Sequence, residues 1–424
     1  MALPLNVGFL LFLFVASNLV GGYLLDLLLL FSATAYFVLL CRREPRPLRR
    51  ALMTAYGLRL FAALVSYTDI YPLEGAKADA LFFTEVGQYY AQYDLVEMIS
   101  RYNEVSGGIY GLIAGIVFRV FTDAPLIMIL FNVILSALTV RYAFLLANRL
   151  FDARLAAVAA WATAFTPYLI ILGATMLREA ALIFLLTYSV YRLVCFRQSR
   201  SVHDLFAAML AISASVPLHG AMAPAMIAVL LIGLFTINPL RTPLTAFVSV
   251  LLVSVVTYLG AQLVTGGITL YKLEFLAKSS EAGVTSEILR HAGGAFSEGN
   301  YREEVVLGSP LDVVWAIPKV VLPFLFQPYP WRIWELKTYI LLFLGSGVWT
   351  LLGLLWLRNV RLVVTNRDAV VVLLIAATVL VVFAFGSSNL NQAIRHNHKV
   401  MPLMLVVMAP YLYRLYRQVF GRLK

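Results

Sequence analysis

Long apolar runs, separated by short polar links, dominate the pattern of this chain. The runs of roughly 16 to 23 residues are close to the ~20 residues that a helix needs to cross the hydrocarbon core of a bilayer. The pattern predicts about twelve transmembrane helices, near residues 4–22, 24–41, 51–67, 124–146, 155–173, 179–196, 204–218, 221–237, 243–264, 337–357, 369–386 and 398–415. We therefore expect an all-α polytopic membrane protein in which residues 1–424 form a single transmembrane domain.

Composition agrees with a bilayer as the solvent of this chain. Hydrophobic residues make up 61% of the 424 residues and charged residues only 13%, and the mean hydropathy is +0.85. A water-soluble chain of this length would enclose its apolar residues in a few cores instead. Residues 1–25 lack a basic segment and a clear cleavage site, so we expect the first helix to be retained rather than removed as a signal peptide.

The formal net charge is +11, and the positions of the Arg residues indicate the membrane topology. Arg residues gather in the short links between apolar runs rather than along one polar face, which argues against nucleic acid as a partner. The Arg-rich links should lie in the cytoplasm, and they occupy residues 41–50, 149–154, 196–200, 357–367 and 413–424. Both termini are then cytoplasmic.

All Arg-rich links can lie in the cytoplasm only if two semi-apolar stretches do not cross the membrane. Residues 107–121 carry Arg119 in mid-run, and residues 311–327 carry Lys319. We predict that both stretches are helices that lie in the outer interface, with spanning helices as the alternative.

Two large loops face outward in this topology, at residues 68–122 and 265–336, and they hold most of the acidic residues. The chain shows no internal repeat, so the sequence gives no support to the inverted-repeat architecture of transporters. Large polar loops on one side of the membrane indicate a site that faces outward.

Asp79 and Glu85 are candidate catalytic carboxylates in the first outer loop, and Lys77 stands two positions before Asp79. Asp79 follows the apolar run at 51–67 closely enough to lie at the membrane surface. A shielded carboxylate within hydrogen-bond reach of a hydroxyl can act as its general base. The alternative is a solvated carboxylate or the N-cap of the following helix, and spacing alone favours that alternative.

Arg178 and Glu179 stand at the outer mouth of an expected helix, in MLREAALIFLL. A guanidinium can grip a phosphate by two parallel hydrogen bonds, and the positive end of the helix dipole favours an anion at the same place. An Arg that extends to the interface beside an N-terminal Glu is the alternative.

The densest polar cluster beside an apolar run is GSSNLNQAIRHNHKVMP, at residues 386–402. Arg395, His398 and Lys399 can neutralise a phosphate or diphosphate there, while amides such as Asn389 can read sugar hydroxyls. Two His residues without a nearby carboxylate or Cys are a weak metal signal, so we favour an anion and predict no metal site. An exposed basic loop is the alternative, and the positive-inside rule opposes it on the outer side.

Two further residues are weaker candidates for substrate binding. His219 stands at a turn between two expected spans, where a local hydrogen bond is the simpler role. Trp331 suits the aromatic belt of the membrane interface and also stacking on a sugar ring, with the belt as the simpler assignment. Cys41 and Cys195 stand beside Arg residues at the ends of apolar runs and support neither a disulfide framework nor a metal site.

The layout of these residues resembles integral-membrane glycosyltransferases of the GT-C fold, of the cell-envelope and polysaccharide-biosynthesis type. In that family a catalytic Asp or Glu stands in the first large outer loop, and interfacial helices follow it. KADALFF and GGIYGLIAGIVFRVFTDAP look like that segment, in which Asp79 matches the carboxylate. Arg178 and Glu179 match the charged mouth of the family's next hairpin.

The late polar cluster is similar to the late outer loop of related polysaccharide-biosynthesis membrane proteins, where an Asn precedes basic residues and a Pro. The matching residues here are Asn389, Arg395, Lys399 and Pro402. The chain departs from the family in two respects. It has no Asp-x-Asp metal motif, and two additional helices precede the catalytic loop, where many family members have one.

The resemblance implies sugar transfer from a polyprenyl-phosphate-linked donor to a hydroxyl of a glycan or lipid acceptor, at the outer face of a bacterial-type plasma membrane. Asp79 would be the base, and Arg178, Arg395 and Lys399 would hold the departing phosphate. Such an enzyme would be inverting and metal-independent and would use no cofactor. No nucleotide-sugar site is expected, since the chain has neither a large cytoplasmic domain nor a Gly-rich phosphate loop.

Two other functions remain open at the level of sequence. A polysaccharide polymerase would join repeat units carried on a lipid diphosphate, and it would depend on basic residues more than on a carboxylate. A transporter or flippase of lipid-linked sugars would do no covalent chemistry. Transporters place polar residues at mid-membrane in broken helices, whereas most candidates here stand at outer helix mouths, which favours an enzyme.

Overall fold

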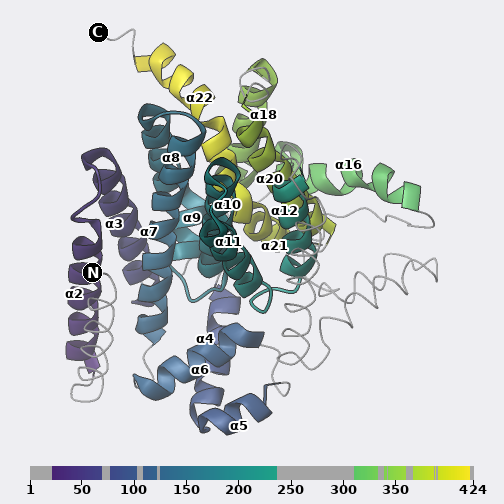
Figure 1. The fold of residues 1–424 in the computed structure, drawn as a ribbon. Coiled ribbons are helices and arrows are strands. Elements are labelled where there is room, and N and C mark those ends of the chain that lie inside the picture. The colour runs from purple at the N-terminus through teal and green to yellow at the C-terminus, as the bar shows by residue number, and fades with distance from the viewer. Residues whose placement is uncertain are drawn as a thin grey trace. The chain divides into compact units, whose positions relative to one another are not determined.

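Helices account for every regular element in the part of the chain that the computed structural model describes (Figure 1). The described residues are 22–68, 77–102, 108–121, 125–235, 310–332, 339–340, 342–359, 366–385, 387 and 390–420. The chain divides into two compact units, Met1–Phe144 with Ala160–Phe184 and Leu145–Ala159 with Leu185–Lys424.

The first unit contains the helices that precede and follow the first outer loop. Its elements are α2 (Gly22–Cys41), α3 (Arg46–Tyr67), α4 (Lys77–Ala91), α5 (Leu95–Ser100), α6 (Gly108–Val120), most of α7 (Pro125–Leu150), α9 (Pro167–Gly173) and parts of α8 (Ala153–Phe165) and α10 (Glu179–Ser199). Helices α2, α3, α7 and α10 match the apolar runs expected at 24–41, 51–67, 124–146 and 179–196 within about five residues, whereas the run expected at 155–173 is divided between α8 and α9.

The second unit holds most of α10 and the later helices. These are α11 (Val202–Ser215), α12 (Met222–Phe235), α16 (Pro310–Phe326), α18 (Gly347–Asn359), α20 (Arg367–Phe385), α21 (Leu390–Asn397) and α22 (Met401–Phe420), with short turns η1 (Pro330–Arg332), η2 (Leu342–Ser346) and η3 (His398–Val400). The expected span at 243–264 and most of the second outer loop lie outside the described residues.

Several described helices are long and apolar enough to cross a membrane. They are Leu24–Cys41, Pro125–Leu150, Glu179–Ser199 and Arg367–Ala384, and α8 with α9 makes a fifth if the bent pair counts as one span. Other apolar helices, such as Val202–Ser215 and Met222–Gly233, are shorter. The chain is therefore a helical membrane protein, and the count of about twelve spans stays a prediction.

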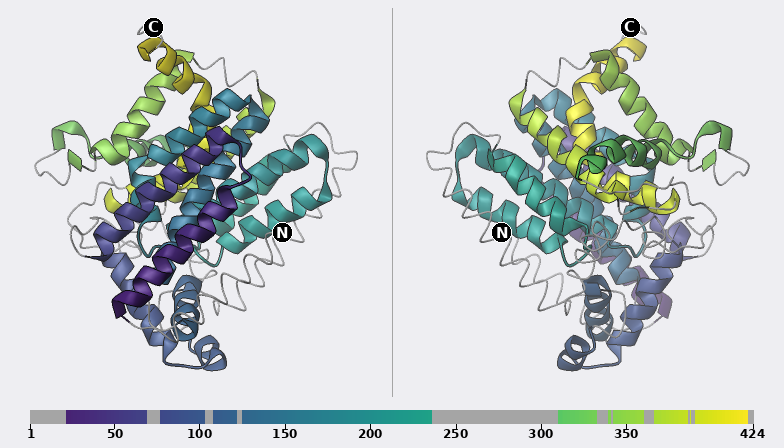
Figure 2. Two further views of the ribbon diagram at one scale, coloured as in Figure 1. Left: turned by 90° about the vertical axis from the view of Figure 1, so that its left-hand side faces the viewer. Right: turned by 90° about the vertical axis from the view of Figure 1, so that its right-hand side faces the viewer.

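Helices α2 and α3 lie side by side, as Figures 1 and 2 show from different directions. The Phe37 ring stacks on the Tyr56 ring with centroids 4.5 Å apart, and the Thr34 and Tyr56 hydroxyls are 3.1 Å apart. Elsewhere on α2, Leu27 and Phe31 are exposed. An apolar face of this kind on a spanning helix is expected to face lipid.

A buried arginine closes the break between α8 and α9, which meet at 63°. The sequence predicts one continuous run here, but Pro167 has no N–H and removes the helical hydrogen bond to the Thr163 carbonyl. The fully buried Arg59 guanidinium donates to the carbonyls of Thr163 at 3.4 Å and Ala164 at 3.2 Å, and its Nε donates to the Ser136 hydroxyl at 2.6 Å. Arg59 therefore donates hydrogen bonds to carbonyls at the break that Pro167 causes.

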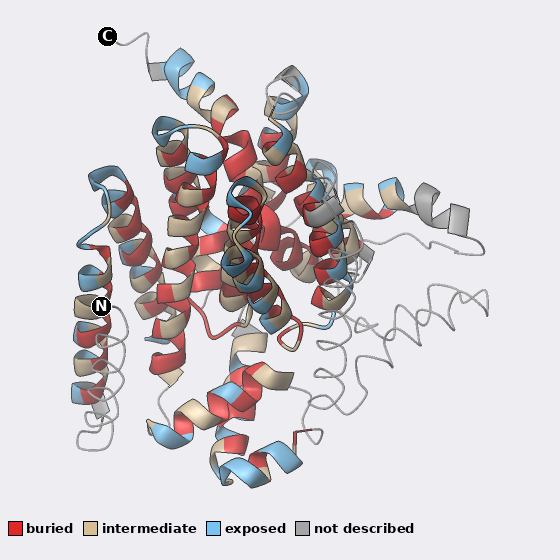
Figure 3. Ribbon diagram, viewed as in Figure 1, coloured by how far each residue is buried: buried red, intermediate tan, exposed pale blue. Residues whose placement is uncertain are grey.

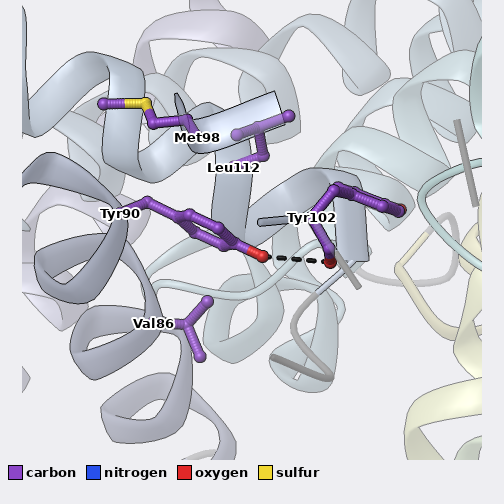
Figure 4. Packing of buried hydrophobic residues seen from close by; sticks show 5 residues of the cluster. All are labelled: Val86, Tyr90, Met98, Tyr102 and Leu112. Atoms are coloured by element: carbon purple, nitrogen blue, oxygen red, sulfur yellow. Dashed lines mark hydrogen bonds between the residues drawn. The ribbon is translucent and has the colours of Figure 1, made fainter. Parts of the chain in front are cut away.

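Glycines on α6 allow it to approach α4 closely. A Cβ at Gly111 would overlap the Val86 side chain, and one at Gly115 would overlap the Cβ of Tyr90. Small residues four positions apart let two helix backbones pack at short range. Figure 4 shows the cluster that covers this contact, formed by Val86, Tyr90, Met98, Tyr102 and Leu112. Within it, the Tyr90 hydroxyl donates to the Tyr102 carbonyl at 3.1 Å.

The length of α6 is consistent with the prediction that residues 107–121 do not cross the membrane. Its 13 residues correspond to roughly 20 Å of helix, which is short of the ~30 Å hydrocarbon core. Arg119 is exposed near its end and donates to the Ala91 carbonyl of α4 at 3.2 Å. The short helix α5 beside it exposes Leu95, Val96 and Ile99 (Figure 3).

Contacts in the second unit bring together three links that the sequence places in the cytoplasm. Arg197 donates to Asp368 at 2.8 Å, and Gln198 donates both to Asp368 at 3.1 Å and to the Arg149 carbonyl at 3.4 Å. Asn366 donates to the Leu150 carbonyl at 2.5 Å. Because these links contact one another, they lie at one end of the unit, which agrees with the prediction that all three are on the same side of the membrane.

The Gly115 contact yields a stability prediction. An alanine in a helix is more stable than a glycine by about 0.5–1 kcal/mol, but overpacking a tight contact costs about 1–3 kcal/mol. Gly115→Ala should therefore lower the thermal unfolding temperature of the purified protein. Gly57→Ala on α3 is the matched control, because a Cβ there meets nothing within 4 Å, and it should not lower that temperature. Equal temperatures for the two variants would contradict the close packing of α4 and α6.

Candidate active site

Asp79 stands in the first turn of α4, with a half-buried side chain. It lies inside the helix, as the third residue, so it is not the N-cap that the sequence left as an alternative. A carboxylate in the first turn interacts favourably with the helix dipole. Lys77 begins the same helix, but its side chain lies outside the described residues.

Glu85, the other carboxylate predicted on this segment, lies on a different face of α4. It stands six positions after Asp79, which places the two side chains about 120° apart around the helix axis. Glu85 is exposed, whereas Asp79 is half-buried. The two candidates therefore have different surroundings on one helix.

Phe83 lies on the face of α4 that carries Asp79, and its ring contacts Arg178. Residues four apart on a helix are neighbours on one face, so Phe83 lies one turn from Asp79. The Arg178 guanidinium lies over the buried Phe83 ring at 5.7 Å from its centroid, within the range of a cation–π contact. The Thr84 hydroxyl also donates to the Met176 sulfur at 3.2 Å. The structure thus brings α4 and the segment before α10 together.

Glu179 begins α10 and Arg178 directly precedes it, so both stand at a helix mouth as the sequence predicts. Glu179 is the first residue of the helix and is fully buried, while Arg178 is half-buried. Glu179 lies near Tyr110 of α6: burial raises the pKa of the Tyr110 phenol, the Asn132 hydrogen bond lowers it, and the Glu179 carboxylate raises it further. The net direction is upward, so this phenol stays protonated across the physiological pH range.

The late basic cluster of the second unit is buried rather than exposed. Arg395, His396, His398 and Lys399 have exposed fractions of 8%, 3%, 0% and 1%. The Lys399 ammonium lies 4.2 Å from the centroid of the Phe383 ring. Cations are costly to bury, so buried basic side chains in a membrane protein are candidates for a functional site.

His219 lies against this cluster, although the sequence places it in a distant turn. Its ring centroid is 5.1 Å from that of His396 and 5.1 Å from that of Phe383. Its Nδ1 accepts the Ala221 N–H at 3.2 Å, which leaves Nε2 as the protonated nitrogen of the neutral ring. His396 in turn places Nδ1 at 2.8 Å from the Ser387 hydroxyl.

The remaining candidates are placed in different ways. Trp331 is 72% exposed and stacks on Tyr329 with ring centroids 4.9 Å apart, which agrees with a belt position and leaves the ring open. Asn389 lies outside the described residues. Among the described residues, no group of three or more His, Cys, Asp or Glu side chains could hold a metal ion.

Two buried polar residues were not among the sequence candidates. Arg59 and Asn132 both stand inside apolar runs, and each bonds backbone carbonyls far along the chain. A lone polar residue within an apolar run is the signal that could have found them, because such residues rarely face lipid. The carbonyls that they bond could not be identified from the sequence.

Part of the chain is similar in sequence to a known protein family. Residues 109–262, less than half of the chain, match the sequence model of a family described as dolichyl-phosphate-mannose-protein mannosyltransferase. No curated protein matches the chain.

The oligosaccharyltransferase of Archaeoglobus fulgidus has a similar fold. Its structure in complex with Zn and sulfate superposes with a TM-score of 0.50 and 16% identity, over 89% of this chain and 50% of that one. Its apo form gives a TM-score of 0.50 and 15% identity, over 90% of this chain and 52% of that one. The chain spans about half the length of these relatives. The resemblance to integral-membrane glycosyltransferases of the GT-C fold is therefore confirmed.

Proposed function

We propose that this protein is a membrane glycosyltransferase that uses a polyprenyl-phosphate-linked sugar as donor and a hydroxyl of a glycan or lipid as acceptor. The observation that carries the proposal is the arrangement on α4, where Asp79 shares a helix face with Phe83 and the Phe83 ring faces Arg178. This arrangement offers a base and an anion-binding guanidinium on neighbouring elements. The family match of residues 109–262 supports the donor class.

In the proposed reaction the acceptor hydroxyl attacks the anomeric carbon of the donor sugar. Asp79 accepts the hydroxyl proton as the new carbon–oxygen bond forms, and the bond from the anomeric carbon to the phosphate oxygen breaks. The polyprenyl phosphate leaves with that electron pair, and Arg178 stabilises the negative charge that develops on it. A single displacement of this kind inverts the configuration at the anomeric carbon.

The second unit supplies a buried basic cluster that we propose binds an anionic group of the lipid-linked substrate. Lys399 and Arg395 supply basic side chains that can donate to an anion, while His219 and His396 can donate hydrogen bonds from their rings. The Phe383 ring holds the Lys399 ammonium from one side. Charge-assisted hydrogen bonds to phosphate are among the strongest that side chains make.

The same cluster also supports a second candidate function. A polymerase that joins repeat units carried on a lipid diphosphate would need several buried cations and would depend less on a carboxylate. The two enzymes differ in the role of Asp79, which is the base in the transferase and is dispensable in the polymerase. In either case we propose the outer face of a bacterial-type plasma membrane and cell-envelope glycan synthesis as the setting.

The role of Asp79 is tested by Asp79→Asn, which keeps the shape of the side chain and removes the proton acceptor. Turnover should fall by ~10²- to 10⁴-fold, the usual effect of losing a general base. Binding of polyprenyl phosphate and the thermal unfolding temperature should stay close to wild type. Sugar transfer to acceptor is the measurement.

Glu85→Gln is the matched control, because Glu85 is an exposed carboxylate on the same helix. It should leave turnover unchanged. Full activity in Asp79→Asn would refute the assignment of the base and would favour the polymerase. Loss in Glu85→Gln alone would move the base to the exposed face of α4.

The basic cluster is tested by Lys399→Met, which keeps the length of the side chain and removes its charge. Affinity for polyprenyl phosphate should fall by about tenfold or more, since a hydrogen bond to a charged group contributes about 1.5–3 kcal/mol. Lys319→Met on α16 is the matched control, because Lys319 is exposed. Equal affinities of the two variants in a titration with polyprenyl phosphate would show that Lys399 does not bind the anion.

A further inference from the structure

Asn132 joins three parts of the first unit through one side-chain amide. It lies on α7 and is only 2% exposed. Its Nδ2 is 2.7 Å from the Thr175 carbonyl oxygen, 2.8 Å from the Leu177 carbonyl oxygen and 3.0 Å from the Tyr110 hydroxyl. An amide nitrogen has two N–H bonds, so three acceptors around it use its full donor capacity.

The two carbonyls belong to the segment that leads directly into the site. Residues 174–178 are not helical and connect α9 to α10. Thr175 and Leu177 are both buried, and buried carbonyls need hydrogen-bond partners within the protein. The Thr175 carbonyl also accepts the Leu177 N–H at 2.8 Å, whereas the Leu177 carbonyl accepts from Asn132. Arg178 follows Leu177 immediately, so the bonds from Asn132 fix the backbone from which the Arg178 side chain extends.

The same segment also contacts α4. Met176 accepts a hydrogen bond from Thr84, and Arg178 lies over Phe83. Phe83 also packs edge-on against Tyr110, with ring centroids 4.9 Å apart. The segment therefore contacts α7 through Asn132 and α4 through Thr84 and Phe83, and Tyr110 of α6 contacts both Asn132 and Phe83.

We propose that Asn132 is a positioning residue for the proposed glycosyl transfer. Its amide holds residues 175–177 so that Arg178 is directed to the face of α4 that carries Asp79, where the guanidinium receives the phosphate of the leaving polyprenyl phosphate. Asn132 does not touch the substrate and acts only through Arg178. This inference rests on the proposed function.

The chemistry of the site explains why an asparagine is needed. An Asp would direct carboxylate oxygens at two carbonyl oxygens, and a Ser has one hydroxyl proton for two acceptors. Leu has a similar volume, but it would remove the donor to the Leu177 carbonyl and leave the Thr175 carbonyl with only the Leu177 N–H, at 2.8 Å. The two carbonyls fix which end of the amide is the nitrogen, since only the nitrogen donates.

A double-mutant cycle between Asn132 and Arg178 tests this role. The measurement is the affinity of the purified full-length protein in lipid nanodiscs for a fluorescent short-chain polyprenyl phosphate. Asn132→Ala should weaken binding by about tenfold. In an Arg178→Ala background the same substitution should cause no further loss, because the group that Asn132 positions is already absent. A general structural defect would weaken binding in both backgrounds.

Thr139→Val is the matched control for loss of a buried polar group on the same helix. The Thr139 hydroxyl is buried and donates only to the Leu135 carbonyl of its own helix among the described contacts. This variant should bind the fluorescent polyprenyl phosphate like wild type. Should Asn132→Ala yield no folded protein, Asn132→Ser replaces it, with a loss of several-fold that also vanishes in the Arg178→Ala background.

The possible outcomes separate the two proposals. Equal losses with and without Arg178, or no loss at all, would overturn the positioning role while leaving the proposed function in place. A wild-type protein that binds no polyprenyl phosphate would overturn both. A loss confined to the background that retains Arg178 supports the positioning role.

Discussion

A backbone carbonyl in the apolar part of a membrane protein has to find its partner inside the protein, and this constraint shapes the first unit. The chain between α8 and α10 leaves the helical pattern twice, at Pro167 and again at residues 174–178. Each interruption frees carbonyls that water cannot reach. Arg59 donates to the first set and Asn132 to the second, and both side chains stand inside apolar runs of the sequence.

These two polar anchors give the candidate site its geometry. With its backbone fixed at both ends, the chain turns so that Arg178 reaches Phe83 on α4, one helical turn from Asp79. The position of α4 depends in turn on its close contact with the glycines of α6. A few contacts between residues far apart in the sequence thus pair the buried carbonyls, pack the helices and place the two charged candidates.

The sequence predicts the helices well because lipid imposes a simple rule of length and apolarity. The runs at 24–41 and 369–386 correspond closely to α2 and α20. The run at 155–173 was expected to be one span, and the break follows from Pro167, a local signal that the apolar content conceals. The contact between His219 and His396 could not be predicted, since it depends on which helices are neighbours. The same holds for the carbonyl partners of Arg59 and Asn132.

The central claim is that Asp79 and Arg178 serve one chemical step, and a structure of the protein with a non-reactive polyprenyl-phosphate sugar analogue tests it most directly. The account predicts that the phosphate lies within hydrogen-bonding distance of the Arg178 guanidinium. It also predicts that the Asp79 carboxylate faces the anomeric carbon, with room for one acceptor hydroxyl between them. An analogue bound with its sugar remote from α4, and with its phosphate out of reach of Arg178, would contradict the account.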